Sequence, residues 1–500
     1  MIFETVAAVD LGSNSFRLQV GRVVDDQIYP LDSLKAPVRL ASGLNADKRL
    51  DAVSQQRALD ALAVFGERLR GFDPAAVRVV ATNTLRVAKN AAEFIDEAEK
   101  VLGFPIEVIA GREEARLIYI GASHSLPAAA HKRMVVDIGG GSTEFIIGKR
   151  HEPQAMESLY MGCVSYSQRF FPGGAMDRKR LREAQAAAAQ ELELIAHDYL
   201  RLGWKEAVGS SGTARAIADV LEMNSLNPAG ETGITREGLE RFCALLVKAG
   251  SPEATGLAGI RGDRLPVLPG GVAIMAAVFE ALDIDRMTYA DGALRLGVLY
   301  DLLGRFHHHD LRDSTVAHFM RRYQVDAAQA ERVRTTAVSA LIQLSDGEPA
   351  EVDVQLLNWA ANLHEIGISV AHNAYHKHGA YILSYADMPG FSRKDQGRLA
   401  ALVLGHRGKL EKLQGLPAED VDWRLVFCLR LAALLHRSRD ERALPAWRVE
   451  AQSRGYRLQL PAAWLAGNPW TAAALREGEG YWQRIGMRFN VDALREKAAG

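Results

Sequence analysis

One twelve-residue pattern occurs twice in this chain and constrains its fold more than any other feature. Residues 10–21 read DLGSNSFRLQVG and residues 137–148 read DIGGGSTEFIIG. Each copy follows an apolar run and has an Asp, a Gly two positions later, a Ser five positions later, alternating apolar residues and a closing Gly. The pattern predicts strand, tight polar turn and strand, whereas a dinucleotide fold or a P-loop would run from the glycines into a helix.

The chain of 500 residues is too long for one hydrophobic core, so we expect several domains. Helical and strand-like patterns alternate after each hairpin, which favours two α/β halves of similar size. In the first half we expect helices over 52–70, 91–102 and from 112, and strands over 77–81 and 106–110. In the second half we expect a long helix over 177–201, helices from 214 and over 269–282, and strands over 206–208 and 286–290.

The pattern changes after residue 304. Helical patterns dominate there, as over 355–364, 398–404 and 425–436, and short alternating runs return only after residue 447, as over 456–460. The expected domains are residues 1–122, 123–304, 305–446 and 447–500.

Composition narrows the classes of function. A formal net charge of -1 argues against general nucleic-acid binding, so any anion site must be local. The three cysteines are far apart in sequence and have no metal-ligand spacing. The N-terminus has no signal-peptide pattern, and no apolar run approaches the length of a transmembrane helix. These features predict a cytoplasmic protein.

Glycine and serine in a tight turn present backbone N–H groups and hydroxyls, which together suit phosphate oxygens. Asp10 and Asp137 end the strands before the two turns, where a carboxylate can hold a divalent cation. A single such turn would more often be a plain hairpin. Two copies with a shared Asp and Ser favour two phosphate grips.

A wider set of motifs resembles one known family, the exopolyphosphatase and guanosine pentaphosphate phosphohydrolase family. The resemblance runs from residue 1 past residue 300 and continues through LHEIGISV and HKHGAYIL almost to the end. Besides the two hairpins, its motifs in the first 300 residues are ATNTLR at 81–86, EEARLIYIG at 113–121, MGCVSYSQRFFPGG at 161–174, GSSGT at 209–213 and DGALRLGVLY at 291–300.

The resemblance implies two ribonuclease-H-like lobes of the actin-like superfamily, followed by an all-α HD-like domain and a small C-terminal α/β lobe. It implies hydrolysis of a terminal phosphoanhydride, with Glu114 as the catalytic residue and Asp137 and Glu144 as metal-associated carboxylates. We add Asp10 to the expected metal site. The expected cofactor is Mg²⁺, with other divalent cations or K⁺ as alternatives, and the expected assembly is a homodimer.

Glu113 and Glu114 are adjacent, and adjacent helical residues point about 100° apart, so only one of the two should face a cleft. Both could also be ordinary N-terminal helix acids. Arg86 suits a bidentate phosphate contact or a surface salt bridge, and GSSGT suits a phosphate loop or a helix N-cap through Ser211 or Thr213. The expected phosphate-binding residues are Ser13, Asn14, Ser15, Thr82, Arg86, Gly139, Gly140, Gly141, Ser142, Ser211 and Gly212.

The helical part resembles a metal-dependent phosphohydrolase domain of the His-Asp type, but His364-Glu365 replaces the His-Asp pair. Because a complete site needs several converging ligands, we expect no catalysis there. Basic residues in this part could instead hold a long polyanion, although they could also be solvated helix faces. The expected channel residues are His376, His378, Arg407 and Lys409.

The first functional hypothesis is an exopolyphosphatase that releases orthophosphate from the end of inorganic polyphosphate. The alternative within the same reaction class is hydrolysis of guanosine pentaphosphate (pppGpp) to the tetraphosphate (ppGpp). A kinase of the same superfamily would need a purine pocket and an acceptor site, neither of which the sequence indicates. A sensor of polyphosphate or alarmone that lacks activity is disfavoured by Glu114, Asp137 and Glu144.

Overall fold

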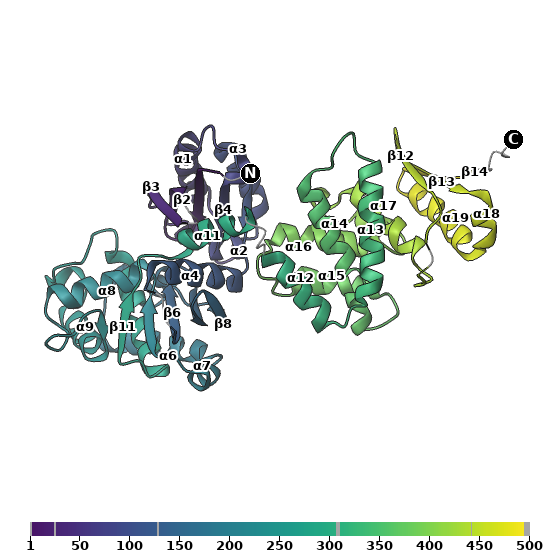
Figure 1. Cartoon of the computed structure of the whole chain (residues 1–500). Coiled ribbons are helices and arrows are strands. Elements are labelled where there is room, and N and C mark those ends of the chain that lie inside the picture. Colours follow the sequence, from purple (N-terminus) through teal and green to yellow (C-terminus); the bar gives the residue numbers. More distant parts are fainter. Residues whose placement is uncertain (1–2, 25–26, 128–129, 307–310, 442, 495–500) are drawn as a thin grey trace. The chain divides into compact units, whose positions relative to one another are not determined.

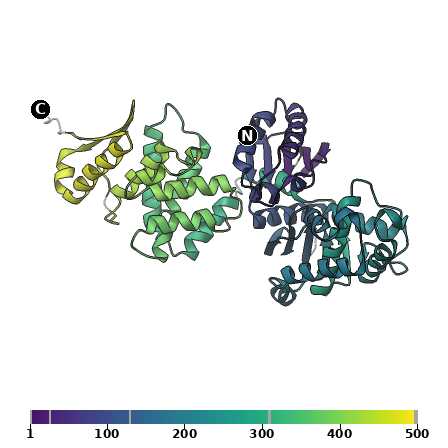
Figure 2. The ribbon, with the colours of Figure 1, turned by 180° about the vertical axis from the view of Figure 1, so that it is seen from behind.

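The computed structural model describes residues 3–24, 27–127, 130–306, 311–441 and 443–494. Its contacts divide the chain into two compact units, Met1–Asp310 and Leu311–Gly500. The first unit has two β-sheets with helices on their faces, and the second has a helical bundle and a small sheet (Figure 1, Figure 2). The expected fold class, two α/β lobes followed by a helical domain and a small C-terminal lobe, is confirmed.

The first lobe is built on a five-stranded sheet with the order β3-β2-β1-β4-β5. Its strands are β1 Thr5–Leu11, β2 Phe16–Val24, β3 Gln27–Ala36, β4 Val77–Ala81 and β5 Ile106–Val108. Its helices are α1 Ala52–Arg68, α2 Asn83–Val87, α3 Ala91–Leu102 and α4 Gly111–Ser125.

The second lobe is built on a six-stranded sheet with the order β10-β11-β9-β6-β7-β8. Its strands are β6 Lys132–Ile138, β7 Thr143–Lys149, β8 Glu152–Leu159, β9 Glu206–Gly209, β10 Ile234–Thr235 and β11 Arg286–Tyr289. Its helices are α5 Cys163–Phe170, α6 Arg178–Leu192, α7 Ala196–Leu202, α8 Gly212–Met223, α9 Arg236–Ala249, α10 Leu268–Ala281 and α11 Leu294–Phe306.

The two sheets repeat one topology. In each, a first strand pairs antiparallel with the second and parallel with a later strand, and the second pairs antiparallel with the third. The closing Gly of both copies of the pattern, Gly21 and Gly148, lies where the register to the third strand shifts, as at a β-bulge. The duplicated pattern therefore marks the start of two equivalent sheets.

The first strand of each sheet is buried on both faces. Ala7 and Val9 of β1 pack with α1 and α3, whereas Val6 and Ala8 pack with α4 and α11. Because successive strand residues point to opposite faces, a strand covered on both sides reads as a continuous apolar run. That explains why the run before each turn is apolar throughout.

Helices α4 and α11 lie between the two sheets and contact both of them (Figure 1). They approach each other closely at Gly297, where an added Cβ would lie 1.7 Å from the Leu117 carbonyl oxygen. Only glycine permits this contact. The crossing pair joins the lobes directly beside the two turns.

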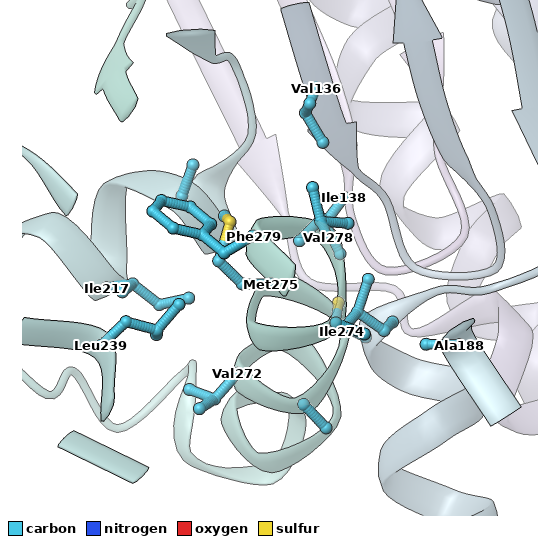
Figure 3. Packing of buried hydrophobic residues seen from close by; sticks show 14 of the residues in the cluster. Val136, Ile138, Ala188, Ile217, Leu239, Val272, Ile274, Met275, Val278 and Phe279 are labelled. Carbon is cyan, nitrogen blue, oxygen red and sulfur yellow. The ribbon is translucent and has the colours of Figure 1, made fainter. Parts of the chain in front are cut away.

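Helix α10 forms the centre of the second lobe. Its residues are almost all buried, which is expected of a helix that is apolar on every side. Val278 lies beside Ile138 of β6, and Ile274 points toward Ala188 of α6 (Figure 3). This packing holds β6, and hence the second turn, in place.

One expected helix is interrupted. The predicted helix over 177–201 is two helices, α6 and α7, separated by residues 193–195. Leu194 in this break is 74% exposed, while Leu192 and Ile195 on either side are buried. The break lets both apolar residues reach the core, a requirement of tertiary packing that the helical pattern did not reveal.

The second unit begins with six helices, α12 Leu311–Arg322, α13 Ala327–Gln343, α14 Glu351–Leu363, α15 Tyr375–Tyr385, α16 Arg393–Gly405 and α17 Trp423–Leu435. They share one core with a small sheet of order β12-β13-β14. The elements of this last part are β12 Arg448–Gln452, β13 Gly455–Pro461, α18 Ala462–Gly467, α19 Pro469–Arg484 and β14 Arg488–Leu494.

Candidate active site

The two turns are equivalent in register. In the first hairpin Asp10 pairs with Arg17, and in the second Asp137 pairs with Glu144. Both turns are closed in the same way. In the first turn, a Cβ added to Gly12 would lie 3.1 Å from the Ser15 carbonyl oxygen, and in the second turn a Cβ added to Gly139 would lie 3.0 Å from the Ser142 carbonyl oxygen. The first hairpin thus places a carboxylate opposite a guanidinium group, whereas the second hairpin places two carboxylates opposite each other.

The two turns face each other across the junction of the lobes. An added Cβ on Gly141 would lie 2.5 Å from the Asn83 side-chain oxygen, and one on Gly140 would lie 2.9 Å from the Ser13 Cβ. Ser13 also accepts a hydrogen bond of 2.8 Å from Thr84, which follows β4. Glycine in the second turn is therefore what lets the first turn approach it.

A polar cavity of about 340 Å³ opens between the turns. Residues from both lobes line it, so the cavity exists only when the two halves are assembled. Most of the expected site residues lie in its lining: Asp10, Ser13, Asn14, Ser15, Thr82, Glu114, Asp137, Gly139, Gly140, Gly141, Ser142, Ser211 and Gly212.

Two expected site residues, Arg86 and Glu144, are absent from this lining among the residues that the structure describes. Glu144 is 1% exposed and accepts a 2.8 Å hydrogen bond from Ser158. Arg86 donates to the Ile109 carbonyl at 2.8 Å and to Glu114 at 3.2 Å. The structure thus places Arg86 against the catalytic candidate and Glu144 beneath the cavity floor.

The two adjacent acids in the first turn of α4, Glu113 and Glu114, point into different surroundings. Glu114 lines the cavity, whereas Glu113 accepts two hydrogen bonds, of 2.7 and 2.8 Å, from Arg116. Only Glu114 faces the cavity, as the angle between adjacent helical residues predicts. The two glutamates therefore have different environments although both are buried.

Two buried carboxylates, Glu114 and Glu144, and two partly buried ones, Asp10 and Asp137, lie around the cavity, and the pKa of each is raised. Burial raises the pKa of Asp10 to about 6 and that of Glu114 to about 7, with neighbouring carboxylates adding to both shifts. Burial also raises the pKa of Asp137, and the pKa of Glu144 rises well above its usual value through burial and then through Glu114 and Asp137. Such clustered shifts are typical of functional sites.

Cationic side chains that sequence reasoning did not assign to the site also line the cavity. Arg17 and Arg295 oppose the rise of the Asp10 pKa, and burial lowers the pKa of Arg17 to about 10. Arg17 and Arg295 stand in motifs of the resemblance, which was a usable signal, whereas the loop over 261–264 gave none. The additional cations are Arg17, Lys35, Arg215, Arg261, Arg264 and Arg295.

Among the residues that the structure describes, three buried polar atoms of the cavity lining have no hydrogen-bond partner. They are the Oδ1 atom of Asp10, the Nδ2 atom of Asn83 and the Nε atom of Arg264. A buried polar group without a partner is costly, so these atoms are suited to bind a ligand or a water molecule. One is an acceptor suited to a cation, and two are donors suited to an anion.

The sequence of the loop at 209–213 suited either a phosphate loop or a helix N-cap, and the structure shows a loop that caps a helix and also lines the cavity. Ser211 caps α8 by accepting a 3.0 Å hydrogen bond from the Ala214 N–H, so the N-cap interpretation is confirmed. The same loop lines the cavity, and Ser210 donates to the Asp137 carboxylate at 2.6 Å. The loop therefore both starts a helix and orients a carboxylate.

The second unit has a cavity of its own, of about 930 Å³, which we name the basic pocket. Of the four expected channel residues, His376, Arg407 and Lys409 line it, and His378 is not among its described lining residues. Two acids, Glu411 and Glu477, share the lining. Further basic residues in the lining are His372, Lys377, His406, Lys412, Arg430 and Arg437.

Neither residue of the His364-Glu365 pair is among the described lining residues, although the His364 ring packs against that of the lining residue His406, with 5.4 Å between the ring centroids. Glu365 accepts a 2.5 Å hydrogen bond from Arg439, and the Nδ1 atom of His364 lies 2.6 Å from the Ala361 carbonyl oxygen. In the part of the chain that the structure describes, no three His, Cys, Asp or Glu side chains are grouped for metal binding, and no helix is both long and apolar enough to cross a membrane.

Solved structures resemble the first unit. An exopolyphosphatase from Cytophaga hutchinsonii matches 60% of this chain and 98% of its own, with 25% identity and a TM-score of 0.54. A Ppx/GppA protein from Aquifex aeolicus matches 61% of this chain and 99% of its own, with 25% identity and a TM-score of 0.51.

Other proteins match nearly the whole chain. A guanosine-5'-triphosphate,3'-diphosphate pyrophosphatase of Aeromonas hydrophila is 40% identical over 94% of this chain and 95% of its own. A protein of the same name from Vibrio cholerae is 38% identical over 97% of this chain and 98% of its own. The Ppx/GppA phosphatase family model matches residues 19–306, and the model of domain III of that family matches residues 311–479. The chain therefore belongs to the Ppx/GppA phosphatase family.

Proposed function

We propose that this phosphatase hydrolyses the terminal 5'-phosphoanhydride of guanosine 5'-triphosphate 3'-diphosphate. Water attacks the terminal phosphorus, the bond to the bridging oxygen breaks, and orthophosphate and guanosine 5'-diphosphate 3'-diphosphate leave. The names of the relatives that match almost the whole chain support this nucleotide over inorganic polyphosphate, which the sequence placed first. Both substrates present the same terminal group to the cavity.

The observation that carries the hydrolytic assignment is the position of Glu114. Its carboxylate lines the cavity between the turns, and burial raises its pKa to about 7. A base with a pKa near the working pH can accept a proton from water during attack and is regenerated afterwards. Arg86, which donates to Glu114, holds this carboxylate in place.

The phosphate groups would be bound by donors from both lobes. The unpartnered Asn83 and Arg264 nitrogens supply two donors, and the backbone of the two glycine and serine turns supplies more. Arg17 and Arg295 lie beside Asp10 and would contact phosphate oxygens from the same side. Charge-assisted hydrogen bonds of this kind stabilise the charge that develops during phosphoryl transfer.

The residues fit a divalent cation such as Mg²⁺. Oxygen donors surround the cavity, and the Oδ1 atom of Asp10 has no partner. Because Mg²⁺ is usually held by one or two carboxylates, waters and substrate phosphates, Asp10 and Asp137 would suffice as direct ligands, with Glu144 behind them. When bound, the ion would neutralise charge on the phosphoryl and leaving oxygens.

Hydrolysis of inorganic polyphosphate is the second candidate. The similarity to the C. hutchinsonii exopolyphosphatase and the basic pocket support it, since a long polyanion needs positive charge away from the reaction centre. We propose that His376, Arg407 and Lys409 contact such a chain. Assembly as a homodimer stays a prediction that size-exclusion chromatography with light scattering can test.

The deciding experiment measures phosphate release from three substrates in parallel, with and without Mg²⁺: the guanosine pentaphosphate, tripolyphosphate and long polyphosphate. We expect the highest kcat/KM for the nucleotide, and little release after removal of divalent ions. Cleavage of polyphosphate alone would reverse the substrate order. No release from any of the three would overturn the hydrolytic assignment.

A further inference from the structure

A network of five charged residues, four of them with nearly buried side chains, lies on a face of α4 other than the one that carries Glu114. Arg78 on β4 donates to Glu107 on β5 at 3.0 Å and to Asp301 on α11 at 2.6 Å. Arg116 on α4 donates to Glu113 at 2.7 Å and to Asp301 at 2.5 Å. Four separate elements are therefore joined through two guanidinium groups.

Four of the five side chains are shielded from solvent, whereas that of Glu107 is 25% exposed. Side-chain exposure is 1% for Arg78, 2% for Glu113, 5% for Arg116 and 7% for Asp301. Salt screens ion pairs in such surroundings only weakly. Because an unpaired charge there would be strongly unfavourable, the ion pairs restrict how far the elements that carry them can move. Asp301 holds the central position, since each of its oxygens accepts from a different arginine.

The network also determines which way the first turn of α4 faces. Glu113 is fixed to Arg116 and, through it, to Asp301, whereas Glu114 points about 100° away into the cavity. Rotation of α4 about its axis would break the bond from Arg116 to Asp301 on α11, and it would move Glu114 with the helix. Helix α11, which carries Asp301, also carries Arg295 in the cavity lining.

We propose that Asp301 is a positioning residue for the hydrolytic reaction, which acts through Arg116 and Glu113 to fix Glu114 relative to Arg295. Asp301 is not among the described residues that line the cavity. This inference rests on the proposed role of Glu114. Displacement of a catalytic group by about 1 Å can lower a rate roughly a hundredfold, so small rotations of α4 have large consequences.

The test is Asp301→Asn. The five residues include three acids and two arginines, so this change leaves two of each and the protein should still fold. The matched control is Glu157→Gln, which breaks the pair with Arg112, an exposed residue of the same helical turn. For Asp301→Asn we expect kcat to fall about tenfold or more with KM within roughly twofold, and no change for the control.

Hydrogen exchange separates this proposal from the role of Glu114. Peptides that span residues 111–120 should exchange faster in Asp301→Asn than in the parent or control, whatever Glu114 does. Arg116→Lys, which keeps the charge but loses the planar fork, should give an intermediate kcat. An unchanged kcat with a lowered Tm would reduce Asp301 to a structural role. Activity retained by Glu114→Gln would instead refute the proposed function.

Discussion

The candidate active-site cleft of the first unit and the basic pocket of the second unit differ in the charge of the groups that they bury. In the cleft, burial raises the pKa of Asp10 to about 6 and of Glu114 to about 7. In the basic pocket, burial lowers the pKa of His376 to about 4 and of Lys412 to about 7, with neighbouring cations adding to both shifts. Desolvation disfavours the charged form in each case, so the sign of the shift follows the charge.

The comparison teaches what each cavity is built to receive. The cleft has an unpartnered acceptor on Asp10 and unpartnered donors on Asn83 and Arg264, which suits a cation together with phosphate. The described lining of the basic pocket has an unpartnered nitrogen on His376 and an unpartnered oxygen on Glu411, and its excess of cations favours an anion. Chemistry is therefore expected in the cleft and binding in the pocket.

The largest expected effect comes from Glu114→Gln, which keeps the shape of the side chain and removes the base. We expect kcat for phosphate release from the guanosine pentaphosphate to fall by roughly a hundredfold to ten-thousandfold. Glu157→Gln is the control, because its partner Arg112 lies on the same turn of α4. If kcat of the folded variant fell by less than a few-fold, Glu114 would not be the catalytic base and the cleft would lose its assigned catalytic role.

The next effect concerns phosphate binding in the cleft. Arg264→Met removes a buried guanidinium whose Nε has no protein partner, so kcat/KM should fall by about tenfold to a hundredfold for every phosphoanhydride substrate. Arg261→Met on the same loop is the control, since Arg261 is exposed and should matter less. If Arg264→Met and Arg261→Met lowered kcat/KM equally, the buried Arg264 would have no special role in phosphate binding.

A smaller effect tests the basic pocket. Lys412→Gln should weaken binding of long polyphosphate about tenfold, through loss of one charge-assisted contact, and leave kcat for the nucleotide unchanged. Lys394, an exposed lysine outside the pocket, provides the control Lys394→Gln. Titration calorimetry of a catalytically inactive parent would measure the affinity, and equal losses in both variants would indicate general charge attraction.

At pH 8, binding of long polyphosphate to the basic pocket should be accompanied by uptake of protons by the protein. The pKa of Lys412 in the pocket is about 7, so much of it is neutral at pH 8, and an anion favours its charged form. Calorimetry in two buffers with different ionisation enthalpies would report the uptake, which should disappear in Lys412→Gln. Uptake that persists in the variant would place the titrating group elsewhere.

The smallest effect is a shift of a few degrees in Tm on addition of Mg²⁺. Raised carboxylate pKa values mean that the folded cleft loses stability as pH rises above the unfolded values near 4, and the loss is complete only above about 7. A bound cation offsets that loss, so Mg²⁺ should raise Tm more at pH 8 than at pH 6. Asp10→Asn should reduce the shift, and a larger shift at pH 6 would contradict a carboxylate site.

Local features were the most predictable from the sequence. Strand Val77–Ala81 and helix Ala91–Leu102 have the expected bounds, and both hairpins form where the duplicated pattern places them. Periodicity and turn chemistry act over a few residues, which is why they are readable in one sequence. The break between α6 and α7 was missed because it depends on packing against a distant core.

The candidate site was predictable only in part. Its turns and acids follow from the duplicated pattern and the resemblance, but Arg261 and Arg264 stand in a loop without any signal. The partner of Arg86 was also open in the sequence, which allowed phosphate contact or a salt bridge. The bond to Glu114 joins residues 28 positions apart, a pairing that only the folded chain can specify.

The sequence by itself determined two related lobes, each opened by a turn that can hold phosphate, because such turns are set by local backbone chemistry. Only the tertiary structure decided how closely the two turns approach each other, that Arg86 donates to Glu114, and that Asp301 is linked to both Arg78 and Arg116. These outcomes depend on which buried charges find partners across the fold, and burial makes each such choice energetically decisive.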